Sequence, residues 1–295
     1  MTLKSHPQPL ACYVHFYSTD PTLTAYELPS PNATKAIILI GGYTDGPHTL
    51  GLVQTTAAHL ATTLPEWSVF EIRMSSSYSG CGHGSLDQDI KEISKLVRYL
   101  RGIGKQKIVI IGHSTGSQDC IHYHLNAQSS NPVDGFVMQG PVSDREWLAM
   151  MIPSDQLAQR KKIAADMIAD GKAQEMMPRE TGWLSFLPPA TAYRYNSMAS
   201  KGGDDDYFSS DLSDETLKGT FGKLSKPTLI LHSDDDETVD PKLDKVALIK
   251  KWASFAPQGT VNELSGTIPG ASHAVKQPES RVWFAETVEK FLKTV

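Results

Sequence analysis

The chain has 295 residues, of which 40% are hydrophobic and 21% are charged, and its formal net charge is −5. This composition is typical of a globular protein built as one large domain or as one domain with an insertion. It contains no long Lys/Arg run, which argues against nucleic acid and anionic membrane surfaces as main partners, and no apolar stretch approaches the roughly 20 residues that span a bilayer.

The N-terminal segment and the cysteines predict a cytoplasmic location. Residues 1–18 lack the apolar segment and small-residue cleavage site of a secretory signal. The three cysteines, Cys12, Cys81 and Cys120, are odd in number and scattered, so a disulfide framework is not expected. A reducing compartment is the simplest interpretation.

Strand-like and helix-like segments alternate along most of the chain. Apolar runs that end in glycine, such as 35–42, are typical of buried parallel strands. Alternation of this kind predicts an α/β fold in which helices cover both faces of a mostly parallel sheet. The predicted strands span 11–18, 23–28, 35–42, 67–74, 107–111, 133–140, 226–233 and 259–264, and the predicted helices span 50–64, 86–100, a segment from Ser114 onward, and 281–295.

The segment 86–100 is the clearest helix in the sequence. Ser85 is a suitable N-cap, and Gln88 follows three residues later. The apolar residues of this segment repeat at helical spacing and share one face: Leu86, Ile90, Ile93, Val97 and Leu100.

The alternation breaks between residues 145 and 225, which we interpret as an insertion. The sequence thus predicts a core made of 1–144 and 226–295. The insertion is either a purely structural elaboration or a lid over the carboxyl edge of the sheet, where ligands bind in open α/β sheets. We favour the lid, which carries the aromatic residues Trp183, Phe186, Tyr193 and Tyr195.

The motif Gly-His-Ser-Thr-Gly follows the predicted strand 107–111 and precedes a helix. It places Ser114 between Gly112 and Gly116. This G-x-S-x-G pattern, in the context of a strand, a sharp turn and a helix, is typical of a nucleophile elbow, in which the serine hydroxyl projects from the sheet edge. The alternative is a tight turn with an inert serine.

A nucleophilic serine needs a histidine base and an acid that orients it. In this arrangement the chain order is serine, acid, histidine. His273 lies in a loop before the last helix, in the expected position for the base. The acid is expected after the strand 226–233, where an acidic run offers Asp236 as first choice and Asp235 as the alternative.

Two backbone N–H groups are expected to bind the oxyanion. One is that of Thr115, directly after the nucleophile. The other is expected in the loop that follows the apolar run 35–40, where Tyr43 is the first candidate and Gly42 the alternative.

The loop 73–89 is rich in serine and lies at the same predicted edge. Ser77 and Tyr78 are candidate substrate-binding residues, although a flexible polar loop has the same composition. No metal site or cofactor is predicted, because His122 and His124 point to different helix faces and no zinc-ligand spacing occurs. Cys120 is expected to be a small core residue.

These motifs resemble those of the α/β-hydrolase superfamily. Within it, "GGYTDG", "SSSYSGCGHGSLDQD" and "GHSTGSQD" look like a fungal family that includes intracellular siderophore esterases. Those enzymes hydrolyse fusarinine-type ferric siderophores, which are cyclic esters of hydroxyornithine units, to free iron. The resemblance implies an α/β-hydrolase fold with a helical lid and a serine esterase with this substrate class.

Two other classes of function remain as alternatives. One is different acyl chemistry on the same triad, as in a lipase, a thioesterase or an acyltransferase. The other is an inactive hydrolase-fold protein that only binds ligands. In each case the predicted partner is a small molecule, with no prediction for the oligomeric state.

Overall fold

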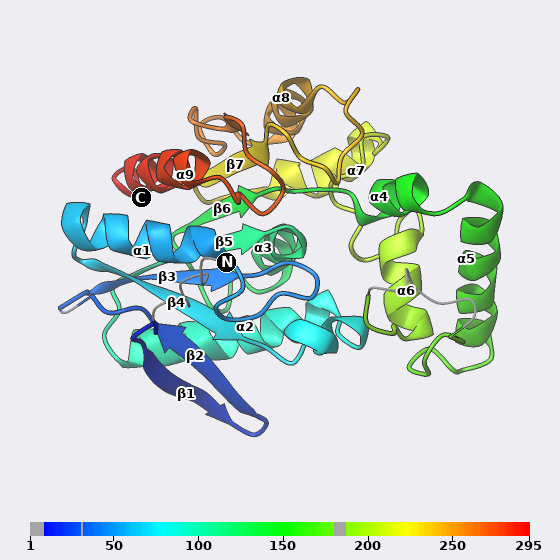
Figure 1. The fold of residues 1–295 in the computed structure, drawn as a ribbon, viewed down its shortest axis with the longest axis horizontal. Coiled ribbons are helices and arrows are strands. Elements are labelled where there is room, and N and C mark those ends of the chain that lie inside the picture. Colours follow the sequence, from blue (N-terminus) through cyan, green and yellow to red (C-terminus); the bar gives the residue numbers. More distant parts are fainter. Residues whose placement is uncertain (1–8, 31, 180–186) are drawn as a thin grey trace, which may run out of the picture.

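A mostly parallel eight-stranded sheet forms the centre of the computed structural model, which describes residues 9–30, 32–179 and 187–295 (Figure 1). The strand order is β1-β2-β4-β3-β5-β6-β7-β8; β1 and β2 pair antiparallel with their neighbours, and the other strands are parallel. The strands are β1 (Tyr13–Thr19), β2 (Thr22–Glu27), β3 (Lys35–Ile40), β4 (Trp67–Arg73), β5 (Lys107–His113), β6 (Gly135–Gln139), β7 (Thr228–Ser233) and β8 (Gly266–Ile268).

Helices cover both faces of this sheet, as the alternating sequence predicts. The α-helices are α1 (Gly51–Thr63), α2 (Leu86–Gly102), α3 (Thr115–Asn126), α4 (Asp144–Met151), α5 (Ser154–Ala169), α6 (Ala192–Ala199), α7 (Asp214–Gly219), α8 (Lys245–Phe255) and α9 (Pro278–Leu292). Two short 3-10 helices, η1 (Tyr78–Gly82) and η2 (Phe221–Lys223), lie in the connections.

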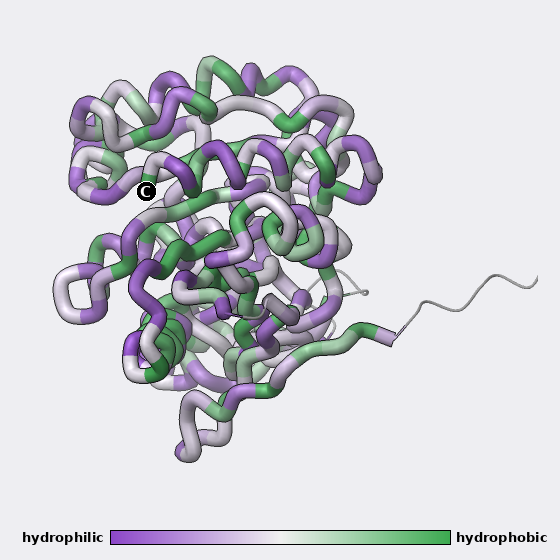
Figure 2. Tube along the Cα trace, turned by 90° about the vertical axis from the view of Figure 1, so that its left-hand side faces the viewer, coloured by the Kyte–Doolittle hydropathy of each residue, from purple (hydrophilic) through white to green (hydrophobic). Residues whose placement is uncertain are grey.

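The side-chain alternation of the central strands supplies two apolar layers. In β3, Ile38 and Ile40 pack in the layer of α2, α3 and α8, whereas Ile37 and Leu39 pack in the layer of α1 and α9. Both sets of side chains are buried, which is why strand 35–40 reads as a continuous apolar run. Figure 2 shows the same segregation, with hydrophobic stretches in the interior and hydrophilic residues on the outer turns.

Helix α2 confirms the expected N-cap. The Ser85 side chain accepts a hydrogen bond from the Gln88 N–H, and the predicted apolar face is buried. The prediction for the last strand is wrong. β8 spans Gly266–Ile268, and of the predicted segment 259–264 only Val261 forms an isolated bridge, to Thr228. Polar Asn262 and Glu263 interrupt the segment, which follows the sheet edge as turns.

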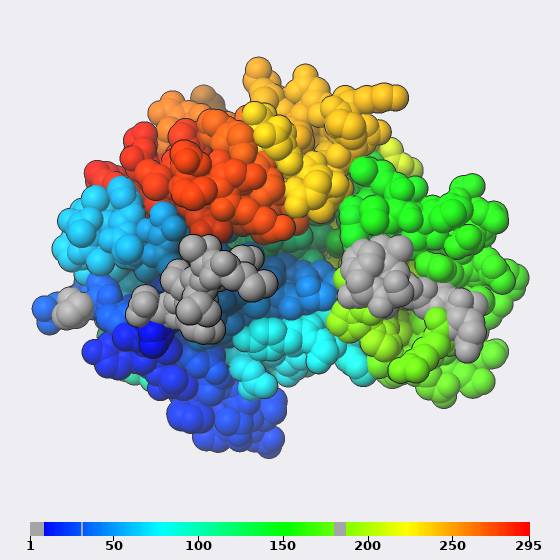
Figure 3. Space-filling model, viewed as in Figure 1, coloured from blue at the N-terminus to red at the C-terminus, as the bar shows by residue number. Residues whose placement is uncertain are grey.

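Between β6 and β7 the described residues form four α-helices, α4 to α7, and η2. Helices α4, α5 and α6 share a separate apolar cluster that includes Leu148, Ala164 and Met198. In the space-filling view, α4 and α5 (green) form a lobe beside the main body (Figure 3). The division of the chain into a core and a lid over 145–225 remains a prediction.

A buried arginine joins this region to the core. Arg194, on α6, is 4% exposed and forms two hydrogen bonds of 2.8 and 2.7 Å with the carboxylate of Asp205. Its Nε donates to the Cys81 carbonyl oxygen (3.2 Å), and its guanidinium lies 5.8 Å from the centre of the Tyr43 ring. The start of α6 is fixed to η1 as well, because the Thr191 N–H donates to the Gly82 carbonyl. Over the described residues, no helix combines the length and apolar character needed to cross a membrane.

The core contains a buried imidazole, that of His232, which is difficult to protonate in the folded protein. His232, on β7, is 1% exposed and stacks on Trp252, with ring centres 5.8 Å apart. Burial lowers the pKa of His232 to about 4, so the ring is neutral in the folded protein near neutral pH.

His232→Phe is expected to remove an acid sensitivity of the fold. Between pH 6.5 and 4 the unfolded chain binds a proton at His232 that the folded chain excludes, so stability falls as pH falls. The phenylalanine variant lacks this loss, and its free energy of unfolding relative to wild type should rise by about 2 kcal/mol between pH 7 and pH 5. Urea titrations at both pH values measure the difference; a difference that is the same at both contradicts the prediction.

Candidate active site

Ser114 lies at the junction of β5 and α3, on the carboxyl edge of the sheet. Its backbone is strained, with φ 53° and ψ −120°, and its side chain is half-buried. Glycine is required on both sides for steric reasons: a Cβ at Gly112 would lie 1.9 Å from the Gly116 carbonyl oxygen, and a Cβ at Gly116 would lie 2.6 Å from that of Ile40. The sequence motif therefore forms the sharp turn that it predicts.

A chain of hydrogen bonds joins the three predicted catalytic side chains. His273 Nε2 lies 2.8 Å from Ser114 Oγ, and His273 Nδ1 lies 2.8 Å from Asp236 Oδ2. The other carboxylate oxygen of Asp236 accepts hydrogen bonds from the N–H (2.9 Å) and hydroxyl (2.6 Å) of Thr238. Burial alone would raise the pKa of Asp236, but the hydrogen bonds and charge of His273, with those from Thr238, lower it to about 2.

The structure distinguishes the two candidate acids by their positions. Asp236 is 6% exposed and contacts His273, whereas the Asp235 side chain is exposed. The Asp235 N–H donates to the Ala271 carbonyl, which fixes the acid loop against the loop that carries His273. The Glu237 carboxylate accepts from the His273 N–H (2.8 Å) and fixes that loop from the other side.

The buried side chain of Gln139 contacts the residues that surround the triad. Gln139, at the end of β6, accepts at Oε1 from His113 Nδ1 (2.5 Å) and donates from Nε2 to the His273 carbonyl (3.2 Å) and to Ser233 Oγ (3.1 Å). Its own carbonyl accepts from the Ser114 N–H (2.9 Å). Burial, with the charge of His273, lowers the pKa of His113 to about 4, which leaves this ring neutral. Gln139 is not among the predicted site residues, although its place at the carboxyl end of a parallel strand was a usable signal.

The loop after β3 presents its backbone to Ser114. The Gly42 N–H already donates to Asp45 Oδ2 (2.9 Å), which favours Tyr43 over Gly42 as an oxyanion donor. Thr115 is the first residue of α3, so its N–H has no carbonyl partner within the helix. The role of Tyr43 and Thr115 stays a prediction.

Gly42→Ala is expected to lower the turnover of esters. A Cβ at Gly42 would lie 2.7 Å from Ser114 Cβ and 3.3 Å from His113 Cδ2, so the serine or the loop must move. A displacement of this size at a reacting group costs roughly 100-fold in kcat. Kinetics with a chromogenic ester measure the effect. Gly102→Ala, where a Cβ meets nothing within 4 Å, is the matched control; equal kinetics in the two variants would contradict the prediction.

Ser114 and His273 open onto a cavity of about 450 Å³. Its walls mix polar and apolar groups: Gly42, Tyr43, Thr44, Asp45, His113, Val142, Asp144, Trp147, Leu187, Met198, Glu237, Thr238, Ala274 and Lys276. Asp144 follows β6 at the carboxyl edge, so its position was predictable in principle. Leu187 and Met198 come from the region between β6 and β7, where no pattern indicated which side chains face the serine.

The structure places Ser77 and Tyr78 outside the set of residues that line this cavity. Ser77 Oγ accepts a hydrogen bond from the Met74 N–H (3.0 Å), and the Tyr78 hydroxyl donates to the Pro47 carbonyl (2.8 Å). Both side chains shape the loop after β4. Their role in substrate binding stays a prediction.

The aromatic residues of the predicted lid have different positions. Trp183 and Phe186 lie outside the described residues. The Tyr193 hydroxyl donates to Asp204 Oδ2 (2.5 Å), and Tyr195 is fully buried in the cluster of α4–α6. Neither tyrosine lines the Ser114 cavity.

The other histidines and Cys120 have structural surroundings. His122 Nε2 lies 2.8 Å from Asp87 Oδ1, and His124 Nε2 accepts a hydrogen bond from the Ser225 N–H (3.0 Å). Cys120 is fully buried in the core, as expected. Within the part of the chain that the structure describes, no group of three or more His, Cys, Asp or Glu side chains is placed to hold a metal ion.

Comparisons with known proteins match nearly the whole chain. The family model described as "Protein of unknown function (DUF1749)" matches residues 1–293. The chain is 29% identical to the fusarinine C esterase sidJ of Aspergillus fumigatus, with 96% of this chain and 95% of that protein covered. It is 31% identical to an esterase of Emericella nidulans, with 92% and 90% covered.

Solved structures agree with the fold. The siderophore hydrolase EstB of Aspergillus fumigatus superposes with a TM-score of 0.81 at 29% identity, covering 97% of this chain and 98% of that one. A monoglyceride lipase of Saccharomyces cerevisiae, 12% identical, superposes with a TM-score of 0.66, covering 99% and 98%. These likenesses confirm the predicted α/β-hydrolase fold and the resemblance to a fungal group that includes siderophore esterases.

Proposed function

The chain belongs to the family described as "Protein of unknown function (DUF1749)", and because esterases are similar to it over nearly the whole length of both chains, we propose that it is a serine esterase with the triad Ser114, His273 and Asp236. The observation that carries the proposal is the continuous hydrogen-bonded chain from Ser114 Oγ through the imidazole to the Asp236 carboxylate. The distances of 2.8 Å suit proton transfer at one end and orientation of the ring at the other.

Acylation follows from this geometry. His273 Nε2 takes the proton of Ser114 Oγ as the oxygen attacks the ester carbonyl carbon. Asp236 holds the Nδ1–H tautomer and stabilises the imidazolium that forms; its low pKa keeps it ionised throughout. The oxyanion accepts hydrogen bonds from the N–H groups of Thr115 and Tyr43. His273 then gives its proton to the leaving alkoxide, and the alcohol departs.

Deacylation repeats the cycle with water. His273 takes a proton from a water molecule as that water attacks the acyl carbonyl of the acyl-enzyme. Collapse of the second tetrahedral intermediate breaks the bond to Ser114 Oγ, which regains its proton from the imidazolium. One ester and one water give one acid and one alcohol, and no cofactor takes part in this scheme.

We assign the substrate to the class of fusarinine-type ferric siderophores. The support is the similarity to sidJ and EstB, whose names describe a fusarinine C esterase and a siderophore hydrolase. The Ser114 cavity suits a bulky substrate of mixed polarity, since Asp144 and Lys276 line it together with Trp147 and Met198. Hydrolysis would open the cyclic triester, separate the iron-binding arms and so weaken iron binding, which would release iron inside the cell.

The region 145–225 is part of the proposal as a lid. It contributes Trp147, Leu187 and Met198 to the walls of the Ser114 cavity. Because these side chains lie beside the reacting serine, the insertion contacts the substrate as well as elaborating the structure. Trp147, on α4, is the first of these three residues along the chain, and it lies close to the predicted start of the lid at residue 145.

The test is product analysis by mass spectrometry with purified wild-type protein and a ferric fusarinine-type triester. The expected products are linear esters that gain one water for each bond cleaved. A short-chain ester, a long-chain acylglycerol and an acyl thioester, assayed in parallel, separate the siderophore class from lipase and thioesterase activity. Cleavage of the simple esters without any cleavage of the triester would refute the substrate assignment and retain the esterase.

A further inference from the structure

A second cavity, of about 400 Å³, lies beside the Ser114 cavity. Val142 and Thr238 line both cavities. Thr238 is also the residue that donates to Asp236, and its hydroxyl lies 3.3 Å from His273 Nδ1. The two spaces are therefore neighbours that share part of one wall, and the proposed mechanism uses only the first.

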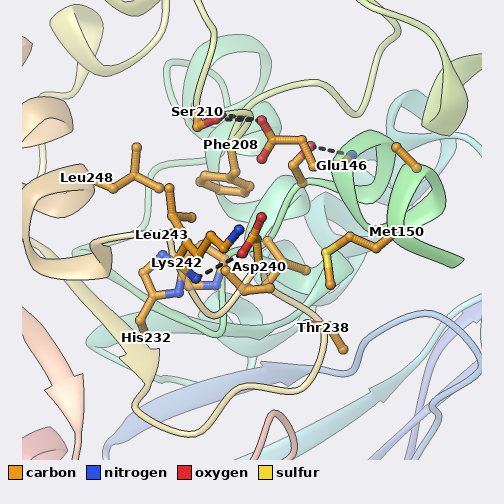
Figure 4. Close-up of a pocket in the computed structure, with 15 residues that line it drawn as sticks. Glu146, Met150, Phe208, Ser210, His232, Thr238, Asp240, Lys242, Leu243 and Leu248 are labelled. Atoms are coloured by element: carbon orange, nitrogen blue, oxygen red, sulfur yellow. Dashed lines mark hydrogen bonds between the residues drawn. The ribbon is translucent and has the colours of Figure 1, made fainter.

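The lining of the second cavity suits an uncharged ligand with an apolar body. Figure 4 shows Leu248 and Met150 at opposite ends of the view, with Phe208 and Leu243 in the wall. The two carboxylates of the lining already accept hydrogen bonds within the protein. The Glu146 carboxylate accepts hydrogen bonds from the N–H (2.9 Å) and hydroxyl (2.7 Å) of Ser210.

The Asp240 carboxylate is also engaged, because its Oδ1 accepts from the Lys242 N–H (2.8 Å). Asp240 and Lys242 are both exposed, so the charges they add lie at the solvent edge of the cavity. The apolar side chains deeper in the lining therefore favour an uncharged ligand group.

One polar side chain in the wall has no hydrogen-bond partner within the described residues. Both ring nitrogens of His232 are covered from water and unpaired, although the residue is only 1% exposed. Because neither nitrogen has surface open to the cavity, the imidazole contributes a flat ring to the wall and no hydrogen-bonding atom. The ring is neutral, since burial lowers its pKa to about 4, so it adds no charge to the wall.

We propose that this cavity is a second substrate subsite, in which an uncharged arm of the ester substrate packs on Leu243, Leu248 and the ring of His232. The inference rests on the proposed function and adds to it. A substrate with several arms is too large for one cavity of about 450 Å³. Binding of a second arm in the neighbouring cavity fixes the position of the ester that lies over Ser114.

The test fills the second cavity with a large side chain introduced at an exposed lining residue. Ala149, an exposed residue of α4, lines the second cavity and is absent from the lining of the first. In Ala149→Trp, the ratio of kcat/KM for the ferric fusarinine-type triester to kcat/KM for 4-nitrophenyl acetate should fall by about tenfold, mainly through KM of the triester.

Met151→Trp is the matched control, because Met151 is exposed on the same helix but does not line the cavity; it should keep the wild-type ratio. A wild-type ratio in Ala149→Trp overturns the subsite, as does an equal loss with both esters. If wild type cleaves only the small ester, the proposed substrate fails first and the subsite falls with it. Wild-type cleavage of the triester together with an unaffected Ala149→Trp refutes the subsite alone.

Discussion

Ser114→Ala should lower kcat for ester hydrolysis by roughly a millionfold, because the variant has no oxygen to form the acyl-enzyme. His273 and Asp236 would remain in place, but without the hydroxyl at 2.8 Å the imidazole has no proton to take. Two measurements check the result: covalent labelling by a fluorophosphonate, and mass spectrometry of the products from a ferric fusarinine-type triester. Both signals should be lost together.

Ser130→Ala is the matched control for this experiment. Ser130 is an exposed serine beyond the end of α3, and the variant should label and turn over like wild type. Labelling of Ser114→Ala at the wild-type rate would identify another nucleophile and contradict the triad. Absence of labelling in folded wild type would instead favour a hydrolase-fold protein that only binds its ligand.

Asp236→Asn should lower kcat by about 10⁴-fold while the fold persists. The amide cannot favour the Nδ1–H tautomer of His273 in the way that the carboxylate does, and it does not stabilise the imidazolium. Steady-state kinetics at neutral pH, with circular dichroism as the test of folding, measure the loss.

Asp235→Asn is the built-in comparison, since the two acids are neighbours with different surroundings. Asp235 is exposed and its side chain faces solvent, so this variant should stay within about twofold of wild type. A large loss in Asp235→Asn with a small loss in Asp236→Asn would reverse the assignment of the acid.

Short-range chemistry made much of the candidate site predictable. The elbow around Ser114 depends on local steric demands, and the glycines at 112 and 116 carry those demands in the sequence itself. The predicted histidine and acid lie next to Ser114 because loops at the carboxyl ends of parallel strands meet at one edge, whatever their separation in the chain. His273 and Ser114 are 159 residues apart; Ser114 follows a strand that the sequence marks clearly, whereas His273 is marked by its loop before the last helix.

Features that depend on packing were not predictable. The contacts of Gln139 and the burial of His232 require knowledge of which strands are neighbours. The last strand was misplaced because β8 has only three residues at the sheet edge, too few for a pattern. The side chains of 145–225 that face Ser114 follow from the fold of that region, in which Met198 enters the cavity while Tyr195 packs inward.

The position of Arg194 has a consequence for how the cavity opens. Burial raises the pKa of Asp89 and Asp144 to about 7 and raises that of Asp119 as well, and in each case the guanidinium charge opposes the effect. Withdrawal of α6 from the core would remove that cation and raise the pKa values of these acids further. We therefore expect α6 to stay packed on the core, and we expect any motion that admits a large substrate to occur in α4 and α5, which contact α6 through apolar side chains.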